Sequence, residues 1–382
     1  MAAGAGRSRS DQPARQPRRR RDRDLERPAP AVPGRLGLVR WAARGRTIVY
    51  GGRLADRPGL RLRLGFDGWR EPVRDVAFEL DDAGRAVAEI PDPDGHLVVD
   101  CAVGAGADWD NNDGADYRLW IGWEPIDCHL HAMQAGSDRL GLAALETALS
   151  SAGIRSGIIS WRVNEALDQL ITGRRWLRQL VWVVPGRTPP AEVRRRLDAG
   201  HVGLKLHPSL DRFPADDRRL DPYLRVAEEV GAPVAVHSAP GDADPDLIRR
   251  LADRFPSVPV LLYHTYLGAP WGRRRAARHA QRQPNLYLET SWCGSREVLR
   301  LVDEVGPDRV LFGSDGAVDG PWHFVREPPN VEGRETYNEV LVSIARQLDA
   351  TSARSVLRDN TSRLFGLASV DDAQARRPPG SG

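Results

Sequence analysis

The chain carries the stretch IDCHLH at residues 126–131, in which an apolar strand pattern ends in two histidines one residue apart. In a β-strand, residues i and i+2 point to the same side, so His129 and His131 are expected to aim at one point. A second stretch, LFGSD at residues 311–315, places an acidic residue at the end of another apolar strand pattern. The position of such polar residues relative to the strand ends decides which α/β fold we predict.

Beyond these two stretches, the sequence after Pro125 alternates short apolar runs with helical patterns. Strands are predicted at residues 126–129, 157–160, 180–184, 202–206, 234–237, 258–264, 286–290 and 310–314. Helices are predicted at residues 142–150, 162–171, 191–197, 222–230, 245–254, 273–281, 296–305 and 335–348. Eight strand–helix units over about 250 residues indicate a (β/α)8 barrel, with a doubly wound open sheet as the alternative.

Polar residues also end the other predicted strands. The fourth ends in KLHP at residues 205–208, the fifth in His237 and the sixth in His264. In a barrel these ends form one mouth, and strands one and eight become neighbours, which an open sheet does not easily achieve. We therefore predict a TIM barrel for residues 124–370, followed by a disordered tail at residues 371–382.

The histidines and the aspartate at this mouth have the chemistry of a metal site. Three imidazoles and one carboxylate, from His129, His131, His237 and Asp315, suit one divalent ion, zinc first, with manganese or iron as alternatives. A bound ion lowers the pKa of a water molecule toward neutrality. Asp315 is expected to move a proton from that water to the leaving group, and His264 to hydrogen-bond the substrate oxygen.

Lys205 is the only lysine in a chain with 55 lysine and arginine residues. An amine can lose its proton or become a carbamate, whereas a guanidinium stays charged, so Lys205 is expected to act in catalysis and substrate binding. His207 is expected to contact substrate or to cap a loop, and Trp322 to offer the substrate a flat apolar surface. Glu289, at the end of the seventh strand, is expected to pair with an arginine, with a position facing the barrel mouth as the alternative.

A different periodicity precedes the barrel. Apolar residues alternate at residues 46–50, 60–64, 76–80, 87–90, 97–103 and 117–122, with Gly, Asp and Pro between these runs. This pattern predicts a small β-sandwich at residues 38–123. Tryptophans flanked by Asn and Asp suit sugar binding, because a sugar stacks on the indole while its hydroxyls bond to the amides. The candidates are Trp69, Trp109, Asn111 and Asn112, with tryptophans that fill the core as the alternative.

Composition and charge limit the classes of binding partner that we expect. The net charge is +3, but the first 40 residues hold eleven arginines and four acidic residues, which leaves the rest of the chain mildly acidic at −4. We expect residues 1–35 to be a disordered Arg/Pro-rich tail, and we expect no nucleic-acid or membrane partner. Three widely spaced cysteines favour a reducing, cytoplasmic location. The expected partner is a small-molecule substrate, and a homodimer is a candidate assembly.

Two resemblances follow from these motifs. The barrel segment resembles the amidohydrolase superfamily, and within it the amidohydrolase-related group that includes the aminocarboxymuconate-semialdehyde and resorcylate decarboxylases. The resemblance rests on Asp-x-His-x-His at residues 127–131, Gly-x-Lys-x-His-Pro at residues 203–208, His237, His264, LFGSD and the closing NTSRLFG at residues 360–366. It implies one metal held by His129, His131, His237 and Asp315, with His264 as the catalytic histidine. In two-metal branches a strand-four lysine is carboxylated and bridges two ions; the context of Lys205 fits the single-metal group better.

The sandwich segment resembles the starch-binding carbohydrate-binding modules of families 25 and 53. The matching motifs are GFDGW at residues 65–69 and WDNND at residues 109–113, the second followed by Tyr117. Members often place a histidine just before the first motif, where this chain has Arg63 and Leu64. The resemblance implies α-glucan as a partner.

Three functions are therefore open. The first is a metal-dependent hydrolase that activates water for attack on a C–N, ester or lactone bond. The second is a non-hydrolytic decarboxylase that uses the same ion. The third is a glucan-binding protein whose barrel is inactive; the complete ligand set argues against it.

Overall fold

The computed structural model describes residues 47–70, 73–112, 116–132, 142–316, 318, 324 and 335–367. The predicted tails at residues 1–35 and 371–382, and Trp322, lie outside these residues. No helix among the described residues combines the length and apolar character that a membrane span requires.

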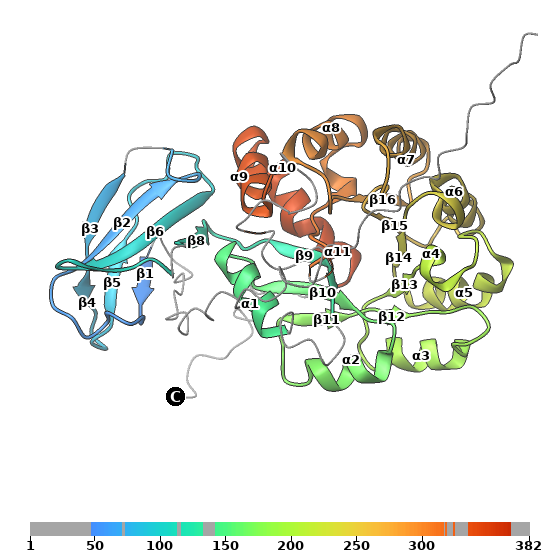
Figure 1. The fold of residues 1–382 in the computed structure, drawn as a ribbon, viewed down its shortest axis with the longest axis horizontal. Helices are drawn as coiled ribbons and strands as arrows, with labels where there is room; N and C mark the ends of the chain where they lie inside the picture. The colour runs from blue at the N-terminus through green and yellow to red at the C-terminus, as the bar shows by residue number, and fades with distance from the viewer. Residues whose placement is uncertain are drawn as a thin grey trace, which may run out of the picture. The chain divides into compact units, whose positions relative to one another are not determined.

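The described part begins with two antiparallel sheets (Figure 1). The strands are β1 (Thr47–Tyr50), β2 (Leu60–Phe66), β3 (Arg74–Ala77), β4 (Glu79–Leu80), β5 (Ala86–Glu89), β6 (Val98–Ala105), β7 (Asp108–Asp110) and β8 (Tyr117–Trp120). One sheet has the order β1-β5-β4, and the other the order β3-β2-β6-β7 with β8 also paired to β6. Residues from both sheets, among them Ile48, Leu64 and Val103, share one hydrophobic cluster. The predicted all-β segment is thus observed as antiparallel sheets.

The structure corrects one strand of this segment. Residues 76–80 were expected to form a single strand, but β3 pairs with β2 whereas β4 pairs with β5. Phe78 separates the two strands, and its N–H bonds to Leu60 O. The chain therefore passes from one sheet to the other at Phe78.

The second part alternates parallel strands and helices, as predicted. The strands are β9 (Ile126–His131), β10 (Ser156–Ser160), β11 (Leu177–Gln179), β12 (Val181–Trp182), β13 (Leu204–Leu206), β14 (Val234–His237), β15 (Val260–Tyr263), β16 (Leu286–Glu289) and β17 (Val310–Leu311). The helices are α1 (Leu142–Ser151), α2 (Asn164–Ile171), α3 (Pro190–Asp198), α4 (Pro208–Asp211), α5 (Asp221–Val230), α6 (Pro245–Arg254), α7 (Pro270–Arg282), α8 (Ser295–Val305), α9 (Tyr337–Gln347), α10 (Ala350–Arg354) and α11 (Asn360–Leu364). This order confirms the α/β class with parallel strands.

Hydrogen bonds connect these strands in a ring. Strands β12 to β17 pair in sequence order, and β9, β10 and β11 form a second run. Leu180 N bonds to Ile159 O and Val181 N to Gly203 O, so the interrupted third strand joins the two runs. Cys128 N bonds to Phe312 O, which joins the first strand to the last. The contact between first and last strands is the one that an open sheet lacks.

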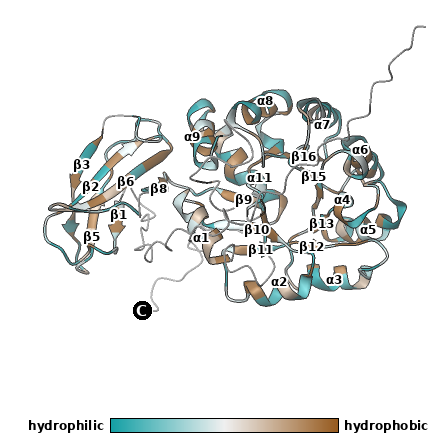
Figure 2. Ribbon diagram, in the orientation of Figure 1, coloured by the Kyte–Doolittle hydropathy of each residue, from teal (hydrophilic) through white to brown (hydrophobic). Residues whose placement is uncertain are grey.

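Helix ends follow from local sequence. Proline occupies one of the first two positions of α3, α5, α6 and α7, where its missing N–H costs no helical bond. Helix α5 ends at Gly231, whose φ of 69° lies in the left-handed region that favours glycine. Helix α9 begins at a capping box formed by Thr336 and Glu339. In Figure 2 most strands of the barrel are largely brown and the outer helix surfaces largely teal, as expected when helices shield an apolar core.

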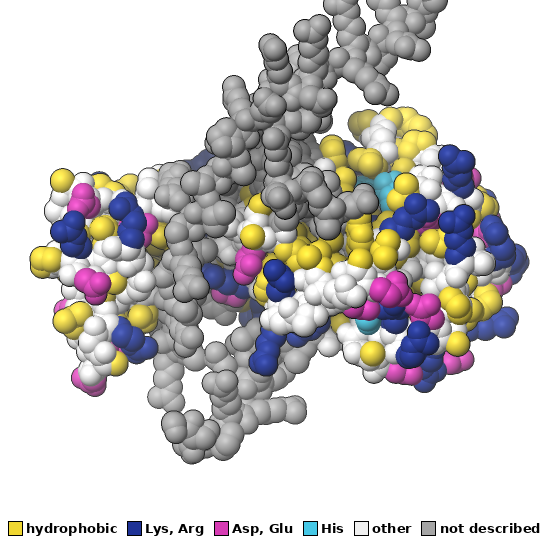
Figure 3. Space-filling view, turned by 60° about the horizontal axis from the view of Figure 1, so that its bottom comes forward, with side chains coloured by type: hydrophobic (Ala, Val, Ile, Leu, Met, Phe, Trp, Pro, Cys, Tyr) yellow, Lys and Arg dark blue, Asp and Glu magenta, His cyan; other side chains and the backbone are white. Residues whose placement is uncertain are grey.

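Arginine supplies the cations of the outer surface, and many of them are paired. Blue and magenta side chains are interspersed on the face shown in Figure 3. Arg196 of α3, although only 8% exposed, binds Glu165, Asp168 at 2.7 Å and Glu192 at 2.8 Å. Three carboxylates thus offset the cost of burying this guanidinium.

Candidate functional site

The ring of parallel strands brings three of the predicted ligands together. His129 and His131 lie on β9, and Asp315 follows β17. His129 Nε2 lies 3.0 Å from His131 Nε2, and Asp315 Oδ1 lies 3.3 Å from each of these nitrogens. Ligand atoms about 2.0–2.2 Å from one zinc ion lie roughly 3.0–3.5 Å from each other, so this triangle has the size of a metal site.

Each of the three ligand residues is held through its other polar atom. His129 Nδ1 is 2.9 Å from Glu289 Oε2, and His131 Nδ1 is 3.2 Å from the carbonyl oxygen of Ser160. Asp315 Oδ2 accepts a hydrogen bond of 2.8 Å from Trp292 Nε1. Such contacts orient metal ligands, because they fix the ring proton on Nδ1 and leave Nε2 for the ion.

Burial keeps His129 and His237 neutral. It lowers the pKa of His129 well below the usual value of 6.5, and Lys205 adds to this effect. Burial, followed by the charge of Lys205, lowers the pKa of His237 to about 3. Because only a neutral imidazole can bind a metal ion, these shifts favour the proposed ligand role at neutral pH.

Lys205 reaches the same centre from β13. The side chain is fully buried, and its Nζ lies 3.3 Å from His129 Nε2 and 3.8 Å from the centroid of the Tyr263 ring. Burial lowers the pKa of Lys205 to about 7, while Asp315 and Glu289 act in the opposite direction. The amine is therefore close to the balance between its charged and neutral forms at neutral pH.

His237 and His264 form a pair beside this triangle. His264 Nε2 lies 3.2 Å from His237 Nδ1, and the two ring centroids are 4.9 Å apart. His129, His131 and Asp315 form a group whose ligand atoms all lie within 4.8 Å of one another; among the described residues, His237 belongs to no such group. The structure thus joins three of the four predicted ligands and places the fourth against His264.

Four residues after strands β15, β16 and β17, one of them Thr265 with a φ of 54°, have a backbone conformation that is rare for side chains with a Cβ atom. The φ angles are 67° at His264, 63° at Trp292 and 56° at Asp315. Such residues cost about 1–3 kcal/mol each and gather at functional sites, where the surrounding structure must hold them. Three of these positions hold the candidate catalytic histidine His264, the candidate ligand Asp315, and Trp292, which orients that ligand.

For Glu289 the structure favours the second of the two sequence-based interpretations, a position at the barrel mouth. The expectation of an arginine partner is wrong: Glu289 is fully buried and accepts hydrogen bonds from His129 Nδ1, from His264 N at 2.8 Å, and from Ser291. Burial raises its pKa to about 8, whereas the hydrogen bonds from His264 and Ser291 lower it. Its place at the end of a strand was the same signal that identified the histidines.

Gly313 makes room for this carboxylate. A Cβ atom at Gly313 would lie 2.5 Å from Glu289 Oε1 and 2.8 Å from the Cβ of His129. Both contacts are far below van der Waals distance, so no larger residue fits without displacing the centre. The glycine of the LFGSD stretch is therefore a packing requirement of the site.

His207 lies at the edge of the barrel site. Its Nδ1 accepts a hydrogen bond of 3.2 Å from Leu210 N at the start of α4, and its ring stacks on His237 at 3.9 Å between centroids. The loop-capping role that the sequence suggested is therefore present, and the stacked ring stays a candidate substrate contact. Trp322 lies outside the described residues.

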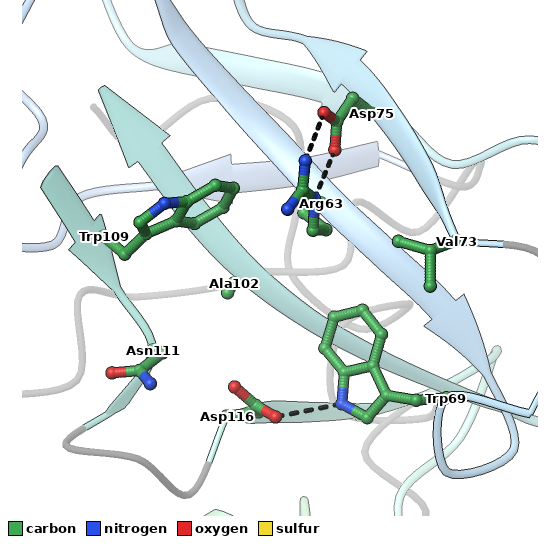
Figure 4. Close-up of a pocket in the computed structure, with 8 residues that line it drawn as sticks. All are labelled: Arg63, Trp69, Val73, Asp75, Ala102, Trp109, Asn111 and Asp116. Carbon is green, nitrogen blue, oxygen red and sulfur yellow. Dashed lines mark hydrogen bonds and ion pairs between the residues drawn. The ribbon is translucent and has the colours of Figure 1, made fainter. Parts of the chain in front are cut away.

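The sandwich has a pocket of its own, of about 820 Å³. It is lined by Arg63, Trp69, Val73, Asp75, Ala102, Trp109, Asn111 and Asp116 (Figure 4). The two indoles lie on either side of Ala102 in Figure 4, with Arg63 and Asp75 at one edge and Asn111 and Asp116 at the other. Apolar walls with polar groups at both edges are typical of a small-molecule pocket.

Contacts around the pocket hold the two indoles in place. Trp69 Nε1 donates a hydrogen bond of 2.9 Å to Asp116 Oδ2. The Arg61 and Arg63 guanidinium carbons lie 4.6 and 4.7 Å from the centroid of the Trp109 ring, as in cation–π contacts.

Three of the four predicted sugar contacts line this pocket. The exception is Asn112, which is buried and donates a hydrogen bond of 2.9 Å to Asp116 O within its own loop.

Comparisons with known proteins agree with the barrel site. The amidohydrolase family model matches residues 126–367, which is more than half of the chain, and the chain therefore belongs to the amidohydrolase family. It is thus an amidohydrolase-family, metal-dependent enzyme whose described His, Asp and Glu groups include sets that could hold a metal ion.

Solved structures show the same fold. An uncharacterised TIM-barrel protein from Bordetella bronchiseptica has 18% identity and a TM-score of 0.50, covering 64% of this chain and 99% of that one. A proposed amidohydrolase from Staphylococcus aureus has 14% identity and a TM-score of 0.50, covering 64% of this chain and 100% of that one. At these identities the likeness concerns the fold alone. A search of curated proteins found no match.

Proposed function

We propose that the barrel at residues 124–370 is a hydrolase that holds one divalent metal ion, zinc first, through His129, His131, His237 and Asp315. Its substrate is a small molecule with a C–N, ester or lactone bond, and its location is cytoplasmic. The observation that carries this proposal is the triangle of 3.0 and 3.3 Å between the two Nε2 atoms and Asp315 Oδ1. The bound ion would supply Lewis-acid activation of water and of the substrate oxygen.

The chain's own residues supply proton transfer and orientation. Asp315 Oδ1 lies at the ligand triangle and can accept a proton there, while Trp292 holds Oδ2. His264 is placed beside the metal ligands, with its ring centroid 4.9 Å from that of His129, and serves to hydrogen-bond the developing oxyanion. Lys205, as a buried amine near neutral pKa, serves to bind a carboxylate or carbonyl oxygen of the substrate.

The test is metal analysis with turnover of an ester, lactone and amide panel, before and after His129→Ala. A metal ion contributes several kcal/mol to the transition state, so we expect loss of bound metal and roughly a thousandfold lower turnover. The matched control is His279→Ala, which removes a histidine of α7 that pairs with Asp246. Unchanged turnover in His129→Ala would reject the proposal, and a wild-type chain without metal or turnover would favour an inactive scaffold.

A decarboxylase at the same site is the second candidate. The observation that favours it is Lys205, because a buried cation 3.3 Å from a candidate ligand can hold a substrate carboxylate against the ion. Decarboxylation releases CO2 without incorporating water, whereas hydrolysis incorporates an oxygen atom from water into the product. Product analysis in ¹⁸O-labelled water distinguishes the two reactions.

For the sandwich at residues 38–123, we propose binding of an α-glucan in the pocket between Trp69 and Trp109. The support is the pair of indoles beside Asn111 and two carboxylates. The experiment is retention on amylose or glycogen gels: Trp69→Ala should abolish it, while Trp271→Ala, which removes an exposed indole on α7, should leave it intact. Equal retention of wild type and Trp69→Ala would contradict the proposal.

A further inference from the structure

A single buried carboxylate contacts much of the barrel site. Glu289 Oε2 lies 2.9 Å from His129 Nδ1, 2.8 Å from His264 N and 2.7 Å from Ser291 Oγ, and Oε1 accepts the Ser291 N–H. Backbone N–H groups can only donate, so both oxygens must accept at least one hydrogen bond. Only the ionised carboxylate can accept all four of these contacts, and the donors stabilise that form against burial, which raises the pKa of Glu289.

The direction of the next hydrogen bond follows from this. The Ser291 hydroxyl has one hydrogen, and donating it to Glu289 Oε2 leaves only its lone pairs for other partners. His264 Nδ1 lies 2.8 Å from Ser291 Oγ, so His264 must donate there and carries its proton on Nδ1. In the resting site His264 Nε2 is then unprotonated, and it can donate to a substrate oxygen only after it takes up a proton.

One further step reaches His237. The unprotonated His264 Nε2 lies 3.2 Å from His237 Nδ1, which therefore donates and carries the ring proton of His237. The remaining nitrogen, His237 Nε2, is left with its lone pair. Glu289 contacts His129 directly and likewise holds the ring proton of His129 on Nδ1. His129 Nε2 is therefore left for a metal ion.

We propose that Glu289 and Ser291 form a positioning pair that fixes the ring protons of His129, His264 and His237, so that His129 and His237 each present an unprotonated Nε2 to the metal site. Glu289 Oε2 is the nearer partner of His129 Nδ1, at 2.9 Å against 3.3 Å for Ser291 Oγ, and Ser291 relays its effect through His264 to His237. The inference rests on the proposed metal site and extends it to two residues that touch neither the ion nor the substrate.

The experiment uses the full chain without metal and has two readouts. Ring ¹⁵N NMR, with each histidine assigned by substitution, reports which nitrogen carries the proton. Competition with a chromophoric chelator reports zinc affinity. In wild type we expect Nδ1 protonation at His129, His264 and His237. An Nε2-protonated form at any of the three overturns the network.

Substitutions at Ser291 test the relay through His264 to His237 separately from the contact between Glu289 and His129. Ser291→Ala should release the ring protons of His264 and His237 while His129 keeps its own, and should lower zinc affinity by roughly 10- to 100-fold. Ser291→Thr keeps the hydroxyl and should restore most of the affinity. The matched control is Ser238→Ala, since the Ser238 hydroxyl is buried next to His237 but has no hydrogen-bond partner among the described residues.

The outcomes distinguish this inference from the proposed function. Unchanged zinc affinity in Ser291→Ala, or an equal loss in Ser238→Ala, contradicts the positioning pair while the metal site stands. A wild-type chain that binds no zinc contradicts the proposed function. In that case the NMR spectrum of wild type alone tests whether the three ring protons lie on Nδ1. If Ser291→Ala does not fold, that same spectrum remains the deciding measurement.

Discussion

In the barrel, Lys205, His129 and Glu289 are fully buried and lie around one point. In the sandwich, the charged pair that lines the pocket, Arg63 and Asp75, has side chains that are 44% and 42% exposed. Both sites are built from strand residues that point to one side. They differ in whether water reaches the charged groups.

This difference in burial changes what the groups can do. Removal from water lowers the pKa of Lys205 to about 7, which makes proton exchange at neutral pH accessible. In the sandwich, the Arg63 guanidinium lowers the pKa of Asp75, which therefore keeps its charge at neutral pH. The barrel centre is thus suited to chemistry, and the sandwich face to binding.

The largest expected difference between the barrel and the sandwich is the response of their hydrogen exchange to added metal. A ligand at about 100 times its Kd stabilises the state that binds it by roughly 2.7 kcal/mol. With zinc we therefore expect slower hydrogen exchange in a peptide that contains β9, and unchanged exchange in one that contains β2, by mass spectrometry. The same measurement on His129→Ala is the control. Equal protection of both peptides would mean that zinc binds elsewhere.

A methyl group at Gly313 should destabilise the barrel. Its Cβ would lie 2.5 Å from Glu289 Oε1, and overpacking of this kind costs about 1–3 kcal/mol. We expect Gly313→Ala to lower the urea midpoint of the barrel transition. The control in the sandwich is Gly51→Ala, since a Cβ there has no described neighbour within 4 Å. A similar decrease of the urea midpoint in both variants would contradict the packing argument.

The smallest expected effect concerns the interior of the sandwich. Tyr117 Oη donates a hydrogen bond of 2.9 Å to the buried Asp110, which Tyr50 also contacts. Tyr117→Phe should cost about 1 kcal/mol, because Tyr50 still donates to the carboxylate. The measurement is the free energy of unfolding from urea titration.

Tyr117→Phe should also change how the free energy of unfolding depends on pH. Burial, with the hydrogen bond to Asp110, raises the pKa of Tyr117 above its usual value of 10. The unfolded chain then loses this proton near pH 10 while the folded chain retains it, so the free energy of unfolding falls as the pH rises above 10. Tyr117→Phe should show a shallower fall than wild type; an identical slope would contradict the assignment.

Most of the barrel could be predicted from sequence because its signals are local. Apolar runs that end in His or Asp identified the strands, and the bond from Cys128 N to Phe312 O is what the barrel prediction required. The interruption of the third strand at Leu180 and the change of sheet at Phe78 could not be predicted. The pattern of apolar and polar residues within a strand does not identify the strands with which it pairs.

The candidate site was predicted as far as strand ends allow. His129, His131 and Asp315 meet as expected because i and i+2 positions and neighbouring strand ends determine their direction. The partner of Glu289 could not be predicted, because 160 residues separate it from His129 and its contact depends on the space left by Gly313. Asn112 closes its own loop through a left-handed φ of 53°, which composition does not reveal.

The solitary lysine has a practical consequence for anyone who handles this protein. Coupling reagents that seek side-chain amines meet no exposed target, because Lys205 is fully enclosed by the barrel. Apart from labelling of the terminal α-amine, dye incorporation would therefore report opening of the barrel, and mild labelling would leave Lys205 unmodified.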